Sequence, residues 1–377
     1  MTSQLFTPIA LRGLTLPNRI VVSPMCQYSA DDGCANSWHM LHLGNLAVSG
    51  PGLLMIEATA VERIGRITHG CLGLYSDNNE LALAEVVAAC RRWGNAPLGI
   101  QLAHAGRKGS AQRPWEGGNS LKPEADAWET VAPSPIPMAE GWATPREATL
   151  ADLARIRDAF AEATRRAARI GLDLVEAHCA HGYLLHAFMS PLSNTRSDAY
   201  GGSVEKCRRF PLEVVEAMRA AWPAEKPLGV RITGSDWMAG GLTVEDAVAF
   251  AKTLKERGVD YVCVSSGGIS LKASIPLGPG YQVPFAERVR REAGIATRAV
   301  GLIAEPRQAE RIVASGQADM VALARGFLDD PRWVWHAAEA LGATASYPPQ
   351  YQRTRAAVWP GAKIARQQPA QSSAAAD

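Results

Sequence analysis

A single unit recurs along this chain, a short apolar run followed by a candidate helix. Eight such runs occur, at residues 19–23, 53–57, 98–102, 172–176, 228–232, 261–265, 297–300 and 319–323. The segments between them space apolar residues as amphipathic helices do, for example at 150–170, 244–257 and 306–315. Strands that are apolar on both faces and alternate with helices are typical of parallel sheets. The pattern predicts an α/β fold, a single closed (β/α)8 barrel of the TIM type.

Two regions lie outside this repeat. Residues 108–149 are rich in Pro, Trp, Gly and Glu, and we expect them to form a long excursion over the catalytic mouth after the third strand. The last residues carry almost no large apolar side chain, so 361–377 is predicted to be a disordered tail. Residues 1–360 then make up one barrel domain.

Charge and composition narrow the function classes. The 377 residues are 47% hydrophobic, and 39 Lys and Arg against 37 Asp and Glu give a net charge of +2. Nothing therefore marks a nucleic-acid or membrane surface, and no apolar run approaches the roughly 18 residues of a membrane span. The seven cysteines form no C-x-x-C pair and the N-terminus lacks a secretion signal. We expect a reduced, cytoplasmic protein that acts on small molecules.

Polar side chains gather at the carboxyl ends of the predicted strands, where barrel enzymes build their active sites. The densest group is the stretch 178–183, His-Cys-Ala-His-Gly-Tyr, after the fourth strand. Two imidazoles and a phenol can hold and protonate a polar organic group. An H-x-x-H pair can also be structural or bind zinc, but Ser23, Glu57 and Gln101 at other strand ends do not complete the usual ligand set of a zinc hydrolase.

The last two strands are followed by residues suited to a phosphate. Gly301 follows the seventh strand, and the stretch 324–326, Ala-Arg-Gly, follows the eighth, which offers close backbone N–H groups and a cation. Gln101 and Arg231, both in strands, can face the ring of a flavin, so flavin mononucleotide (FMN) suits this set. No G-x-G-x-x-G opens a helix and no G-x-x-x-x-G-K-[ST] occurs, which disfavours a tightly held dinucleotide or nucleoside triphosphate.

Some of these residues have simpler explanations. A guanidinium within an apolar strand needs a partner, and a buried salt bridge to Glu176 or Asp236 is the alternative for Arg231. His39 and His42 repeat the H-x-x-H spacing on a helix, where packing and hydrogen bonding explain them.

Seven short motifs occur in order along nearly the whole chain. They are 24–28 (PMCQY), 38–44 (WHMLHLG), 101–107 (QLAHAGR), 178–184 (HCAHGYL), 190–196 (SPLSNTR), 200–203 (YGGS) and 322–331 (ALARGFLDDP). Together they resemble the Old Yellow Enzyme family, and most closely its bacterial branch, from about Leu5 to Trp359. The resemblance implies an FMN-dependent ene-reductase that NADPH or NADH reduces and that then transfers a hydride to an activated alkene in a ping-pong cycle. Its expected substrates are enones, with quinones and nitro compounds as further candidates.

The resemblance also implies roles for single residues. His178 and His181 match the pair that binds the electron-withdrawing oxygen of the substrate, and Tyr183 matches the proton donor to the α-carbon. Tyr28 matches a phenol that lines the substrate pocket, and Cys26 matches a thiol near the flavin. Without that context, Cys26 would read as an inert buried thiol.

The cofactor-binding positions implied by the resemblance are Ser23, Pro24, Met25, Cys26, Ala58, Gln101, Arg231, Gly301, Ala324 and Arg325. Ala324 stands where many relatives have glycine. Trp359 lies in a segment similar to a tail that reaches a neighbouring subunit's substrate pocket, which requires a homodimer or homotetramer. No metal is implied.

Two other classes stay open at this point. One is a metal-dependent or aldolase-type barrel lyase or hydrolase, although no lysine ends a predicted strand for Schiff-base chemistry. The other is a non-catalytic module that binds a flavin or another ligand.

Overall fold

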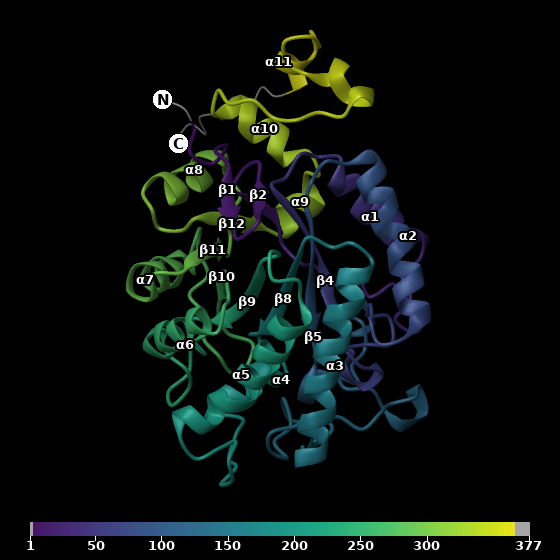
Figure 1. Ribbon diagram of the computed structural model, residues 1–377, viewed down its shortest axis with the longest axis vertical. Helices are drawn as coiled ribbons and strands as arrows, with labels where there is room; N and C mark the ends of the chain where they lie inside the picture. Colours follow the sequence, from purple (N-terminus) through teal and green to yellow (C-terminus); the bar gives the residue numbers. More distant parts are fainter. Residues whose placement is uncertain (1–2, 366–377) are drawn as a thin grey trace, which may run out of the picture.

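The computed structural model describes residues 3–365. Eight parallel strands close into a barrel in the order β10-β11-β12-β3-β4-β5-β8-β9, and helices surround it (Figure 1). The strands are β3 (Ile20–Val22), β4 (Leu53–Ala60), β5 (Leu98–Ala103), β8 (Leu174–Cys179), β9 (Leu228–Thr233), β10 (Tyr261–Ser265), β11 (Ala296–Val300) and β12 (Met320–Leu323). The predicted (β/α)8 barrel is confirmed.

Two strands, β4 and β8, run three residues further toward the catalytic end than the sequence indicated. Strand β8 pairs His178 with Arg231 and Cys179 with Ile232 of β9, so His178 lies in the barrel wall rather than in the loop after it. Strand β4 continues to Ala60 past an irregularity in its pairing at Glu57. The ends of β4 and β8 were not recognised in the sequence, because polar residues there interrupt the apolar runs that mark a strand.

The helices follow the strands as the repeat requires. They are α1 (Ser37–Ala47), α2 (Asp77–Trp93), α3 (Leu150–Arg169), α4 (Leu184–Met189), α5 (Val204–Ala221), α6 (Val244–Glu256), α7 (Val283–Ala293), α8 (Pro306–Ala314), α9 (Arg325–Asp329), α10 (Trp333–Ala340) and α11 (Ala362–Ala365). The three helices expected from apolar spacing, α3, α6 and α8, end within one residue of the predicted positions.

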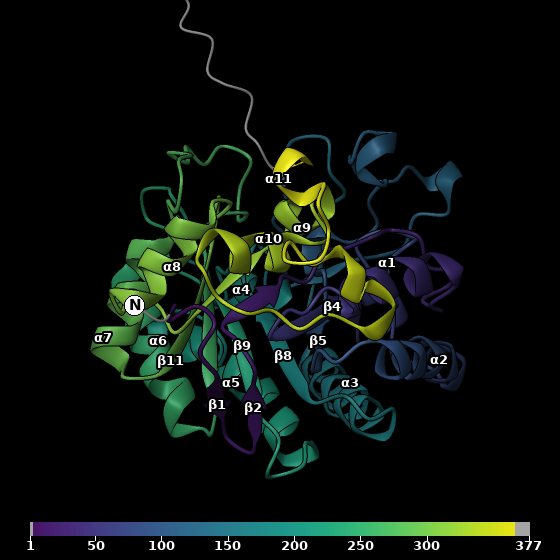
Figure 2. The ribbon, with the colours of Figure 1, turned by 90° about the horizontal axis from the view of Figure 1, so that it is seen from above.

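A short hairpin closes the barrel at the amino ends of its strands. It consists of β1 (Ile9–Leu11) and β2 (Leu14–Leu16), which pair antiparallel. Leu11 and Leu16 are buried in one apolar cluster with barrel residues such as Val21 and Met320. In Figure 2 the hairpin lies at the lower edge of the barrel. The opposite end is therefore the one left open for a ligand.

The predicted excursion after the third strand lies at that open end. It begins at the last residue of the 3-10 helix η2 (Gly106–Lys108) and contains the 3-10 helix η3 (Pro114–Glu116). The indole of Trp115 meets the ring of Tyr28, which follows β3, edge to face at 6.0 Å between centroids.

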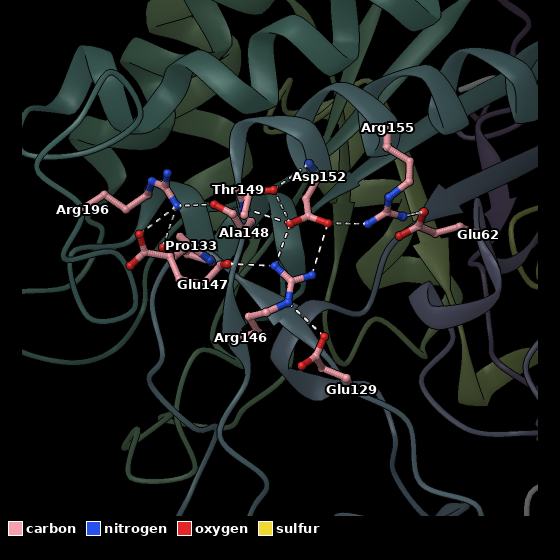
Figure 3. A network of polar contacts seen from close by, with 10 residues as sticks. All are labelled: Glu62, Glu129, Pro133, Arg146, Glu147, Ala148, Thr149, Asp152, Arg155 and Arg196. Atoms are coloured by element: carbon pink, nitrogen blue, oxygen red, sulfur yellow. Dashed lines mark hydrogen bonds and ion pairs between the residues drawn. The ribbon is translucent and has the colours of Figure 1, made fainter.

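A network of ion pairs and hydrogen bonds holds the base of the excursion to the barrel (Figure 3). At the N-terminus of α3, Asp152 accepts hydrogen bonds from Arg146 at 2.7 Å and from Arg155 at 2.9 Å. Arg155 also pairs with Glu62, which lies after β4. Arg196 donates to the Ala148 carbonyl at 2.7 Å. The excursion is thus fixed at its return into α3.

The segment after the barrel carries η5 (Pro349–Thr354) and α11, and α10 and α11 lie at the top of Figure 1. Helix α11 falls inside the stretch predicted to be a disordered tail, and the rest of that stretch, 366–377, lies outside the described residues. Within residues 3–365, no helix has the length and apolar character to cross a membrane.

Candidate active site

The two histidines of the H-x-x-H motif meet at the end of β8. His178 Nε2 lies 3.2 Å from His181 Nδ1, and the two rings are nearly perpendicular, at 79°. His181 adopts a left-handed backbone, with φ of 60°, and Gly182 follows with φ of 75°. This turn bends the chain back immediately after the strand, which brings both imidazoles to one place.

Both imidazoles are neutral donors. Burial, reinforced by the charge of Arg231, lowers the pKa of His178 and of His181 well below the ordinary histidine value. The backbone N–H of Ala180 donates to His178 Nδ1 at 3.2 Å, so the proton of His178 is on Nε2. His181 Nε2 lies 2.7 Å from Ser265 Oγ at the end of β10.

The phenol of Tyr183 lies beside them at the start of α4. Its ring contacts the His178 ring edge to face, with centroids 4.9 Å apart. Burial raises its pKa well above the ordinary tyrosine value, so the phenol carries its proton at neutral pH. The structure therefore brings His178, His181 and Tyr183 together, as the sequence predicted.

Arg231 is a buried cation with almost no partner among residues 3–365. Its guanidinium makes one long hydrogen bond, 3.4 Å from Nη2 to Ser265 Oγ, and its Nε is buried without any partner. Both alternative salt bridges are wrong, because Glu176 pairs with Arg298 at 2.6 Å and Asp236 pairs with His186 at 2.9 Å. An orphaned guanidinium is what a polar, electron-rich ligand ring would satisfy.

A cavity of about 350 Å³ extends from this arginine across the ends of the last strands. It is lined by His181, Arg231, Ser265, Ser266, Tyr281, Gln282, Val300, Gly301, Leu302, Ile303, Ala304, Ala322, Leu323, Ala324, Arg325 and Gly326. Its volume is in the range of small-molecule sites.

The far end of the cavity suits a phosphate. Arg325 is exposed, and its guanidinium forms no hydrogen bond or ion pair with any residue of the described chain. Gly301 has φ of 114°, and a side chain there would place Cβ 2.4 Å from Gln282 Nε2. Ala324 has a negative φ of −107°, so its methyl group imposes no strain where relatives have glycine. A bare backbone and a free guanidinium together fit the phosphate of FMN.

The remaining predicted flavin contacts lie on the other side of the barrel mouth. Ser23 is buried and its N–H donates to the Leu323 carbonyl of β12 at 2.9 Å, which holds the start of the Pro24 to Cys26 loop. The Nε2 of Gln101 donates to Glu176 at 2.7 Å, which leaves its Oε1 as the free acceptor. Met25 is partly buried and Ala58 is buried on β4.

The buried carboxylate of Glu57 holds the loop that carries Cys26. Glu57 Oε2 accepts from the Gln27 N–H at 3.1 Å, and Glu57 Oε1 lies 3.6 Å from His39 Nε2. Burial and this carboxylate raise the pKa of the Cys26 thiol well above its ordinary value, so Cys26 is a neutral thiol. His39 is thus explained by helix capping and this contact, as its position on α1 suggested.

Trp359 is not brought to this site within the chain. It is 41% exposed, and its backbone hydrogen bonds are to Arg355 and Ala362 in its own segment. Its predicted role, in the substrate pocket of another subunit, stays a prediction.

Three features of the site escaped sequence reasoning. Ser265 ends a predicted strand but had no predicted role. In the pair of His186 and Asp236, which supports the turn after β8, Asp236 was considered as a partner of Arg231 and His186 had no predicted role. Gly182 donates to His186 Nδ1 at 2.7 Å. Lys108 directly follows the 101–107 motif, which was the available signal for it, and its Nζ donates to the His181 carbonyl at 2.8 Å.

Comparison with known proteins decides the family. The NADH:flavin oxidoreductase / NADH oxidase family matches residues 4–343. The chain belongs to this family. It is an FMN-dependent oxidoreductase of the Old Yellow Enzyme type that uses NADH or NADPH, as the resemblance implied.

Several relatives span nearly the whole chain. The NADPH dehydrogenase of Geobacillus sp. (strain WCH70) is 48% identical over 94% of this chain and 99% of its own length. The NADPH dehydrogenase of Bacillus subtilis (strain 168) is 41% identical over the same shares. Morphinone reductase in complex with tetrahydroNAD is 27% identical, with a TM-score of 0.74 over 92% of this chain and 93% of that protein.

Proposed function

We propose that the enzyme reduces the C=C bond of α,β-unsaturated carbonyl or nitro compounds. The observation that carries this proposal is the juxtaposition of two neutral imidazoles and a protonated phenol, with Nε2 of His178 3.2 Å from Nδ1 of His181 and Tyr183 against the same ring. Two donors for one oxygen and a separate proton source are what polar addition of hydride and proton across an alkene requires.

The histidines act on the oxygen of the substrate. Each neutral imidazole has one N–H, and with substrate bound the two N–H groups would donate to a carbonyl or nitro oxygen in place of their contacts with each other and with Ser265. Two such donors stabilise the negative charge that develops on that oxygen. Burial keeps both rings neutral. A neutral imidazole does not readily lose its N–H proton, so neither ring competes with Tyr183 as the acid. The substrate is thereby held with its β-carbon electron-poor.

Tyr183 then supplies the proton. Its O–H bond breaks as a C–H bond forms at the α-carbon, and the phenol recovers its proton from solvent. Bound FMN would supply the hydride for the β-carbon after taking it from NADPH or NADH.

The residues that would hold FMN come from both sides of the mouth. Arg231 would face the ring edge with Gln101 Oε1, and Arg325 with the backbone at Gly301 and Ala324 would hold the phosphate. The loop from Ser23 to Cys26 and Ala58 would cover the rest of the ring, with Cys26 as a neutral thiol beside it. Tyr28, whose ring meets Trp115 edge to face, would line the substrate side.

Oligomer, substrate range and location belong to the proposal as well. We infer a homodimer or homotetramer in which Trp359 enters a neighbouring pocket, since Trp359 and Val358 are exposed. Quinones and nitro compounds offer the same oxygen acceptors and are further candidate substrates. All seven cysteines are free thiols, which supports the expected cytoplasmic location.

Separated half-reactions test this function. The purified protein should bleach on anaerobic addition of NADPH and regain its flavin absorbance with 2-cyclohexenone. Tyr183→Phe should slow the second step at least tenfold and leave the first within about twofold, because general-acid catalysis contributes roughly 10²–10⁴-fold. Equal slowing of both steps would remove the proton-donor role.

A further inference from the structure

Lys108 lies where two catalytic-end loops cross. It is the last residue of η2, and its Nζ donates to the His181 carbonyl at 2.8 Å and to the Gly268 carbonyl at 3.2 Å. The first carbonyl belongs to the turn after β8, and the second to the loop after β10. Lys108 therefore joins the segment that carries a substrate-binding imidazole to the loop after β10, two strands further round the barrel.

The turn after β8 and the loop after β10 are in close backbone contact at Gly182 and Gly268. A side chain on Gly182 would place Cβ 2.2 Å from the Gly268 carbonyl oxygen, and one on Gly268 would place Cβ 2.7 Å from His181 Cα. Both glycines have positive φ, 75° and 85°. Two backbone carbonyls thus converge on one ammonium group, which satisfies them together.

The same ammonium group lies over the phenol of Tyr183. Lys108 Nζ is 5.0 Å from the centroid of that ring. No ion pair within the described chain includes Lys108, so this charge has carbonyl dipoles and an aromatic face but no carboxylate partner. Burial, with the nearby charge of Arg107, lowers the pKa of Lys108 to about 8, so the amine is mostly protonated at pH 7. A half-buried, unpaired cation is costly to keep unless its charge is used.

We propose that Lys108 is a positioning residue for proton transfer: it fixes the turn that carries His181, and its charge stabilises the tyrosinate that remains when Tyr183 protonates the α-carbon. The inference rests on the proposed function, because it needs Tyr183 as the proton donor. A cation over the ring face is attracted to the ring, and the attraction grows as the ring becomes an anion, so it lowers the barrier to loss of the proton.

A double-mutant cycle on the FMN-loaded enzyme tests the electrostatic part. Lys108→Met removes the charge and keeps the length of the side chain. It should leave reduction by NADPH within about twofold and slow reoxidation by 2-cyclohexenone roughly tenfold or more. In the Tyr183→Phe background the same substitution should slow reoxidation by much less, because no tyrosinate forms there and only the loss of the carbonyl contacts to the turn remains.

Matched variants separate charge from structure. Lys108→Arg keeps the charge and should restore most of the reoxidation rate. Lys226 offers the same kind of contacts away from the site, with Nζ donating to the Leu172 carbonyl at 2.6 Å and lying 5.2 Å from the Trp222 ring. Lys226→Met should leave both half-reactions unchanged. If Lys108→Met loses FMN, Lys108→Gln, which keeps a donor for the carbonyls, replaces it in the cycle.

The outcomes are distinct. Equal slowing by Lys108→Met with and without the Tyr183 hydroxyl, or no slowing at all, would overturn the proposal for Lys108 and leave the proposed function standing. Reoxidation of Tyr183→Phe at the wild-type rate would instead contradict the proposed function itself.

Discussion

Glu176 on β8 and Arg298 on β11 form an ion pair of 2.6 Å inside the barrel, and neither side chain is exposed. Tyr261 donates to the same carboxylate oxygen at 2.6 Å, and Gln101 donates to the other at 2.7 Å. These three donors satisfy both oxygens of the Glu176 carboxylate. Arg231, on the strand next to β8, is left with its charge directed to the cavity.

Arg231 should therefore contribute to cofactor binding more than to folding. We expect Arg231→Gln to weaken FMN binding by roughly 10- to 100-fold, the loss of a charged hydrogen bond worth about 1.5–3 kcal/mol, with the thermal unfolding of the apoprotein little changed. Quenching of flavin fluorescence on titration measures the affinity. Arg290→Gln is the control, because that arginine pairs with Asp319 at 3.0 Å on the surface, and it should not alter FMN affinity. An unchanged affinity in Arg231→Gln would contradict the ring-edge assignment.

Gly301 should tolerate no side chain. In Gly301→Ala the new Cβ would lie 2.4 Å from Gln282 Nε2 at a φ of 114°, so Gln282 must move and the backbone is strained. We expect lower FMN content after purification and a stability loss of about 1–3 kcal/mol, measured by urea unfolding. Ala324→Gly makes the opposite change at the neighbouring phosphate position, where φ is negative, and it should leave FMN affinity within about threefold. Equal FMN content in both variants would show that the cradle at Gly301 is not used.

We expect Lys108 to lower the free energy of unfolding of the protein. Its pKa of about 8 in the folded protein lies below the ordinary value of 10.5, so the unfolded chain binds the proton more tightly. The folded state is thus penalised below pH 8, and the penalty fades as the pH rises toward 10.5. This lowering of the pKa corresponds to a cost of roughly 3 kcal/mol in the free energy of unfolding. The two hydrogen bonds that Lys108 donates to backbone carbonyls offset part of that cost.

Lys108→Met should accordingly stabilise the FMN-saturated protein by about 1 kcal/mol at pH 7. The difference in stability between Lys108→Met and wild type should be smaller at pH 9.5. Thermal melts at the two pH values measure this. A variant that is destabilised at pH 7 would mean that the carbonyl contacts outweigh the cost of the buried charge.

The barrel could be predicted from the sequence because each strand is a local apolar run, and each helix between them has local periodicity. The hairpin of β1 and β2 was missed because strands of three residues carry too little pattern. The true end of β8 was missed because His178 is polar although it is buried in the barrel wall. Local signals determine the elements, and tertiary pairing adjusts their ends.

The site shows the same division. His178, His181 and Tyr183 lie within six residues of each other, so their meeting was predictable. The pairing of Arg298 with Glu176 was not, because these residues are 122 positions apart and the sequence offers several carboxylates and several arginines as partners. Lys108 was missed because its partners are backbone carbonyls, which no residue type marks in a sequence; its place directly after the 101–107 motif was the one signal for it.

If His178 and His181 together hold the substrate oxygen, the affinity of a bound phenol depends on both imidazoles. The most direct measurement is a titration of the purified protein with p-hydroxybenzaldehyde, read as a long-wavelength charge-transfer absorbance, in wild type, His178→Ala and His181→Ala. We expect the band to form in wild type and each substitution to weaken phenol affinity about tenfold or more, because each removes one donor to a charged oxygen. Phenol affinity that is unchanged in both variants would contradict this role of the two histidines.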